Sequence, residues 1–115
     1  MANTFKTVTK AGVTSLDVIY TVASSTTTVV LGLMLGNTTT SQVTATVTLN
    51  SDTAARSGAN DEANQAVELI TNAPIPAGSS LELLGGNKVV LETTDEIKIS
   101  ASGATDVALS IMEIT

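Results

Sequence analysis

The alternation of apolar residues with threonine between Gln42 and Leu49 is the feature that most constrains the fold. Val43, Ala45 and Val47 would share one face of an extended strand, and the threonines between them would share the other. A helix repeats every 3.6 residues, so a period of two indicates a strand with one buried face. The chain is therefore expected to build its core from half-buried strands.

Other segments carry the same signal. Residues 96–101 alternate in the same way, and residues 107–114 begin with alternation and end nearly all apolar, which predicts burial on both faces of a C-terminal strand. Gly32 interrupts the leucine-rich run 26–35 and predicts a bend or bulge. Weaker strands are predicted at 5–9, 18–22, 66–70, 80–84 and 88–91.

Turn-forming residues separate these strands. Residues 74–78 contain two prolines and a glycine, which predict an extended run followed by a turn. Residues 85–87 are Gly-Gly-Asn and predict a tight hairpin, because these residues adopt positive φ at low cost. Further turns are predicted at 23–25, 36–39 and 93–95. Helix is expected at most as one turn at 61–66.

Short strands separated by turns about 8–12 residues apart predict an all-β fold. We expect a single-domain β-sandwich, jelly-roll or immunoglobulin-like, with about eight antiparallel strands. Residues 1–16 are expected to form an N-terminal arm or a first strand, and residues 17–115 the sandwich. The small, polar segment 51–65 is expected to be an inserted loop, either a variable insertion or a contact loop.

The composition excludes many function classes. The chain has no histidine and no cysteine, so it has no Ser-His-Asp triad, thiolate nucleophile, disulfide or zinc finger. A net charge of -6 and a single Phe and Tyr argue against nucleic-acid binding. The apolar run 29–35 is shorter than the roughly 20 residues of a membrane span. We therefore expect no nucleic-acid partner, no membrane insertion and no cofactor.

The few acidic clusters give no catalytic geometry. Asp95 and Glu96 are neighbours, and neighbours on a strand point to opposite faces, so they are interpreted as solvated turn residues, as are residues 61–62. Asp52 and Asp61 could bind calcium, but the spacing of an EF-hand is missing. An enzyme is therefore not expected.

Charged residues make up only 14% of the chain, against roughly 25–35% of a usual surface. The surface would be rich in threonine instead, which suits either an assembly subunit or simply a threonine-faced β-domain. Phe5, Lys6 and Lys10 lie in the N-terminal segment, which could add a strand to the sheet of a neighbour or be an ordinary first strand.

The order of several motifs resembles a known group of proteins. The run from Tyr20 to Leu33 leads into Asn-Thr-Thr at 37–39, followed by Ile-Pro-Ala-Gly-Ser-Ser-Leu-Glu at 75–82, Gly-Asn-Lys-Val-Val-Leu-Glu at 86–92 and Leu-Ser-Ile-Met-Glu-Ile at 109–114. This order resembles small virion structural proteins of tailed bacteriophages, especially marine and cyanobacterial ones. The resemblance implies a non-enzymatic, β-rich component present in many copies.

We therefore expect a capsid decoration (cement) protein, made in the host cytoplasm and located in the virion. It would bind the outside of the shell, most simply as a trimer, and bridge neighbouring major capsid proteins. Phe5, Lys6 and Lys10 are expected to contact the capsid. The C-terminal residues Ile111, Met112 and Ile114 are expected to pack subunits together.

Two alternatives remain open from the sequence. One is a tail, neck or fibre-attachment protein of the same virion, which would differ in copy number. The other is a β-sandwich that binds host glycans through Tyr20 and Phe5, since sugars commonly stack on aromatic rings.

Overall fold

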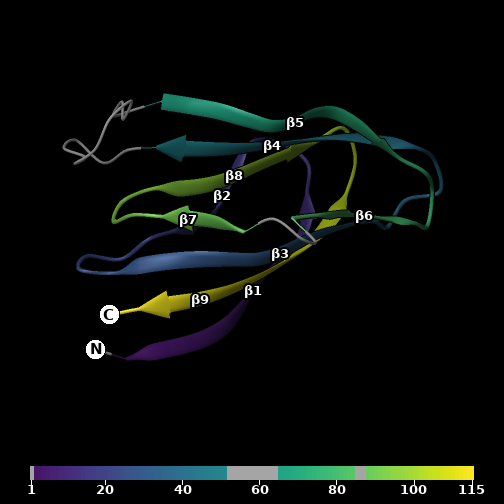
Figure 1. The fold of residues 1–115 in the computed structure, drawn as a ribbon. Coiled ribbons are helices and arrows are strands. Elements are labelled where there is room, and N and C mark those ends of the chain that lie inside the picture. The colour runs from purple at the N-terminus through teal and green to yellow at the C-terminus, as the bar shows by residue number, and fades with distance from the viewer. Residues whose placement is uncertain (1, 52–64, 85–87) are drawn as a thin grey trace.

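The computed structural model describes residues 2–51, 65–84 and 88–115, which form two antiparallel sheets packed face to face (Figure 1). Sheet A has the order β1-β9-β3-β6, with β7 also paired to β3, and sheet B has the order β2-β8-β4-β5. The strands are β1 (Asn3–Val13), β2 (Asp17–Thr21), β3 (Thr27–Asn37), β4 (Val43–Ser51), β5 (Gln65–Ile75), β6 (Ser80–Leu83), β7 (Val89–Leu91), β8 (Glu96–Ala101) and β9 (Thr105–Ile114).

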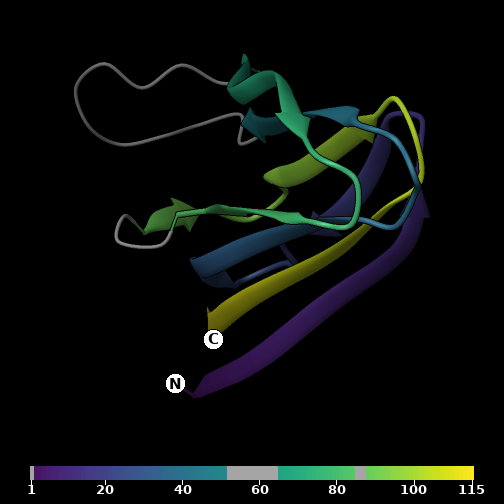
Figure 2. The ribbon, with the colours of Figure 1, turned by 90° about the vertical axis from the view of Figure 1, so that its right-hand side faces the viewer.

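The strand order is that of a jelly roll. It confirms the predicted all-β sandwich and selects the jelly-roll form over the immunoglobulin-like form. The first and last strands pair with each other, and β1 and β2 lie in different sheets. An immunoglobulin-like sandwich would instead pair its first two strands within one sheet. The two chain ends consequently lie side by side at one end of the sandwich (Figures 1 and 2).

Strands β6 and β7 are two halves of one edge strand. Both pair antiparallel with β3, β6 along Leu33–Gly36 and β7 along Thr28–Val30, so they run in the same direction. The predicted hairpin between them is therefore wrong, because hairpin strands run in opposite directions and pair with each other. Residues 85–87 themselves lie outside the described residues.

The core is aliphatic and lies between the two sheets. Alternate residues of β3 and β9 from sheet A meet alternate residues of β4 and β8 from sheet B, as the period of two predicted. The buried apolar residues are Val13, Val22, Val30, Leu33, Leu35, Val43, Ala45, Val47, Ile75, Leu91, Ile97, Ile99, Ala101, Val107, Leu109 and Ile111.

A β-bulge in β3 changes which residues face the core. Val30 pairs with Ile111, but Gly32 pairs with Ser110, so Leu31 is an extra residue in the strand. Before the bulge the even-numbered Val30 points inward, and after it the odd-numbered Leu33 and Leu35 do. The bend or bulge predicted from Gly32 is confirmed.

Strands β4 and β5 extend into the predicted loop. Ser51 pairs with Gln65, so strand structure occupies both ends of the segment 51–65. Gln65 and Ala66 begin β5, which corrects the end of the predicted helical turn at 61–66, while residues 61–64 lie outside the described residues.

Asn37 closes the other end of the sandwich with a buried side chain. Its Nδ2 donates to the carbonyl oxygens of Ser41, Ile75 and Pro76 at 2.9–3.2 Å, and its Oδ1 accepts from Thr39. The amide thus ties the end of β3 to the end of β5, because a buried polar group must find partners.

The packing predicts that a leucine-to-alanine substitution lowers the free energy of unfolding far more in the core than on the surface. Leu109 is fully buried on the central strand β9, whereas Leu16, in the turn between β1 and β2, is 62% exposed. Leu109→Ala should lower the free energy of unfolding by about 2–5 kcal/mol, because it removes apolar contacts and leaves a cavity. Leu16→Ala should change it by less than about 0.5 kcal/mol. Urea denaturation measures both, and equal losses would contradict this account of the core.

Candidate functional site

The N-terminal segment lies in the chain's own sheet, as the first-strand alternative described. Strand β1 pairs with β9 from Asn3 opposite Ile114 onward, and Phe5 and Lys6 point to opposite sides of it. Phe5 lies on the outer face of sheet A and is 70% exposed. Lys6 and Lys10 lie on the other side and form ion pairs, Lys6 with Glu113 at 2.6 Å and Lys10 with Asp17 at 3.3 Å.

The C-terminal strand separates the other three predicted contact residues. Ile111 is fully buried in the core, so its side chain is not available to a second subunit, contrary to the expectation. Met112 and Ile114 lie half-buried on the outer face of sheet A. The prediction that this strand is buried on both faces is therefore wrong, because no described element covers that outer face.

An apolar row crosses the whole outer face of sheet A. The strand register places Phe5 of β1 beside Met112 of β9, Met112 beside Val29 of β3, and Val29 beside Val90 of β7. Directly opposite residues share a face of a sheet, so these four side chains form one line across four strands. Val90 is 59% exposed, and the row is thus open to solvent at both ends.

The corresponding row on sheet B is polar. There Val18 of β2 lies beside Lys98, which lies beside Thr48, which lies beside Glu68. Val18 is exposed, but it is isolated among polar neighbours, as single surface apolar residues commonly are. The two outer faces of the sandwich therefore differ in character, and only the face of sheet A resembles an interaction surface.

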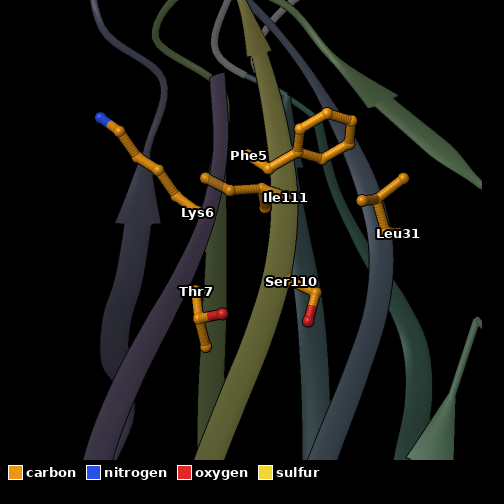
Figure 3. Close-up of a pocket in the computed structure, with 6 residues that line it drawn as sticks. All are labelled: Phe5, Lys6, Thr7, Leu31, Ser110 and Ile111. Carbon is orange, nitrogen blue, oxygen red and sulfur yellow. The ribbon is translucent and has the colours of Figure 1, made fainter. Parts of the chain in front are cut away.

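Three hollows follow the outer face of sheet A along β9. The largest, about 300 Å³, is lined by Phe5, Leu31 and Ser110 together with Lys6, Thr7 and Ile111. Figure 3 shows the ring of Phe5 reaching across β9 toward Leu31, with Ser110 below them, while Lys6 points away. Two smaller hollows are both lined by Met34 and Ala108. The small residues Gly32, Ala108 and Ser110 thus leave a shallow trough beside the apolar row.

A polar cluster holds the two sheets together below this face. The Tyr20 hydroxyl of β2 donates to Glu113 Oε2 at 2.6 Å and lies 2.7 Å from the hydroxyl of the buried Thr28. Lys6 reaches the other oxygen of the same carboxylate. Lys6 and Tyr20 therefore meet at the Glu113 carboxylate, and Thr28 joins them through the Tyr20 hydroxyl. We call these four residues, which come from four strands of both sheets, the Glu113 clasp (Lys6, Tyr20, Thr28 and Glu113).

The hydrogen bonds of the clasp shift two pKa values. Lys6, and then Tyr20, donate to the Glu113 carboxylate and lower its pKa from the ordinary 4.5. Burial, and then the bond to Glu113, raise the pKa of Tyr20 from 10.0 to about 12. Both shifts favour a charged Glu113 beside a neutral Tyr20, which is the arrangement expected of a structural contact.

Of the other acidic candidates from the sequence, Asp95 lies in the described part of the chain and Asp52 and Asp61 do not. Asp95 is buried, and its carboxylate accepts from the backbone N–H of Glu92, which corrects its interpretation as a solvated turn residue. Asp52 and Asp61 lie outside the described residues. No group of three or more acidic, histidine or cysteine side chains that could hold a metal occurs in the described ranges.

The described part of the chain also contains no helix that is long and apolar enough to cross a membrane.

Comparison with known proteins identifies no family. No family model matches the chain, and no curated protein matches it. Among solved structures, one match is to a chain from "Bacillus endospore appendages form a novel family of disulfide-linked pili", with a TM-score of 0.48 and 15% identity over 99% of this chain and 87% of that one. At this similarity the match carries no argument about function.

The Glu113 clasp predicts that the Tyr20 hydroxyl contributes to the free energy of unfolding by an amount that depends on pH. Tyr20→Phe should lower the free energy of unfolding at pH 7 by about 1–3 kcal/mol, because a bond to a charged carboxylate is lost. Since the pKa of Glu113 is lowered by folding, its stabilisation is present above pH 4.5 and lost as the pH falls through the folded pKa. Since the pKa of Tyr20 is raised, its stabilisation is present below pH 10.0 and lost as the pH rises toward about 12.

Urea denaturation of wild type and Tyr20→Phe across pH 3–12 measures this difference. Glu113→Gln serves as the matched control, since it keeps the shape of the side chain and should abolish the acid limb. A difference between wild type and Tyr20→Phe that stays constant over the whole range would show that the hydroxyl does not act through Glu113.

Proposed function

We propose that this chain is a non-enzymatic structural subunit that joins neighbouring molecules through the outer face of sheet A. The apolar row of Phe5, Met112, Val29 and Val90 is the observation that carries this proposal. Contiguous exposed apolar surface is unfavourable in water and typically marks a contact surface. The polar outer face of sheet B, in the same molecule, supports the view that the row is not a general property of the surface.

The finer assignment is a component of a bacteriophage virion, as the sequence resemblance suggests. We favour a capsid decoration protein that binds the outside of the shell and bridges major capsid proteins. A subunit that binds only the assembled shell would stabilise it by mass action. A tail, neck or fibre-attachment protein of the same particle is the alternative, and it would use the same kind of surface in fewer copies.

The contact residues of this proposal differ from those expected from the sequence. Phe5, Met112 and Ile114 remain candidates, because they lie on the outer face of sheet A. Lys6 and Lys10 are engaged in ion pairs within the chain, and Ile111 lies in the core. Val29, Val90 and Met34 join the candidates.

The glycan-binding alternative receives little support from the position of Tyr20. Its hydroxyl is held by Glu113 and Thr28 between the sheets, so its ring belongs to the interior contact. Phe5 is then the remaining exposed aromatic ring among the described residues, and one ring offers a poor platform for a sugar.

The proposal predicts that the chain is present in purified virions and that its copy number identifies its place. Quantitative mass spectrometry against the major capsid protein should find hundreds of copies per particle for a decoration protein and about a dozen for a tail or neck protein. Purified particles of the source phage that lack the chain would contradict the virion assignment. Turnover of a substrate by the purified chain would contradict the non-enzymatic role.

A further inference from the structure

We propose that a second copy of this chain covers the outer face of sheet A, with the two sheets packed face to face about a two-fold axis that runs along the strands. The inference rests on the proposed role of this face as an assembly surface and adds the identity and orientation of the occupant. Three features support it: the area of the face, the positions of its charged residues, and the complementarity of the face to the same face of a second copy.

The face is large enough for a stable pair. Strands β1 and β3 have 11 residues each and β9 has 10, which corresponds to roughly 35 Å at about 3.4 Å per residue. Four strands spaced about 4.8 Å apart span roughly 19 Å. The resulting plan area of roughly 650 Å² approaches the roughly 800 Å² that each partner buries in a standard interface.

A two-fold axis along the strands places the edge strand β1 opposite the edge strands β6 and β7 of the second copy. It places the inner strand β9 opposite the inner strand β3 of the second copy. In the apolar row, Phe5 then faces Val90 of the second copy, and Met112 faces its Val29. Each contact occurs twice, because a two-fold interface is self-complementary. All four apolar side chains of the row are thereby removed from water against apolar partners.

The rows farther along the strands also match under this axis. The register places Thr9, Ala108, Met34 and Glu82 in one row, so that the exposed Met34 faces the small Ala108 of the second copy. The hollow of about 150 Å³ that Met34 and Ala108 line would receive this side chain. Between the two rows, Ser110 faces Gly32, where a side chain would meet open space, so the sheets can approach closely.

The positions of the charged residues favour an axis along the strands over an axis that crosses the strands between the two rows. An axis across the strands that passes midway between the two rows would place Val90 against Glu82 of the second copy, which buries a carboxylate without a partner. Along the strands, Glu82 instead faces Thr9 at the rim. Two copies that each carry a charge of -6 repel most where their surfaces are charged, and the four residues of the apolar row carry none.

A charge-exchange experiment tests both the occupant and the axis. Phe5→Glu and Val90→Lys should each weaken dimerisation about tenfold or more, because each buries a charge in the apolar row. The double variant should recover most of this loss, since each glutamate then faces a lysine of the second copy. Within one chain, the strands that carry residues 5 and 90 are about 14 Å apart, so these two side chains form no direct ion pair. Sedimentation equilibrium measures the dissociation constant, and circular dichroism reports the fold.

Val18→Lys is the matched control, because Val18 is similarly exposed, at 44%, on the polar face of sheet B. It should leave dimerisation unchanged. Cross-linking gives a second measurement that does not depend on new charges, since the natural chain has no cysteine. A short bismaleimide should join Phe5→Cys chains to Val90→Cys chains and should not join either variant to itself.

The outcomes separate this inference from the proposed function. A purified wild-type chain that is monomeric at high concentration, or a trimer as the sequence resemblance suggests, overturns the face-to-face pair but leaves a role in the virion intact. A folded double variant that fails to recover dimerisation, or cross-linking of Phe5→Cys chains to themselves, overturns the axis. A dimer with the expected rescue, from a chain that is absent from virions, supports the pair and contradicts the virion assignment.

Discussion

Pairing of β9 with both β1 and β3 is the interaction on which the rest of the sandwich depends. It joins the two ends of the chain, and it places Leu109 and Ile111 in the core between the sheets. The same strand directs Ser110 and Met112 outward, because successive side chains of a strand alternate between its faces. The core and the apolar outer face of sheet A are thus two sides of one strand.

The bulge in β3 connects a local irregularity to the character of the surface. One extra residue, Leu31, lets Val30 and Leu33 both point into the core although their spacing is odd. The bulge therefore adds Leu31 to the wall of the trough and places Gly32 beside Ser110. A regular strand of the same length would have turned either Val30 or Leu33 away from the core.

Neighbouring residues of β1 point to opposite faces of sheet A. Lys6 points toward sheet B and completes the Glu113 clasp, whereas Phe5 points outward and begins the apolar row. The clasp stabilises the edge of the sandwich because its partly buried carboxylate is fully engaged. Among the described residues, no other element packs on the outer face of sheet A, so its apolar side chains would be buried only by the proposed second molecule.

Period-two alternation in the sequence was sufficient to predict the all-β class and the positions of several strands, because alternation depends on local geometry alone. The bulge in β3 was predicted from Gly32 itself. The composition excluded chemistry that requires histidine or cysteine. Only the tertiary structure decided which strands lie side by side, and hence that β6 and β7 continue one edge and that Phe5, Met112, Val29 and Val90 form a row. These four residues come from four strands, and their alignment depends on long-range register that no single segment encodes.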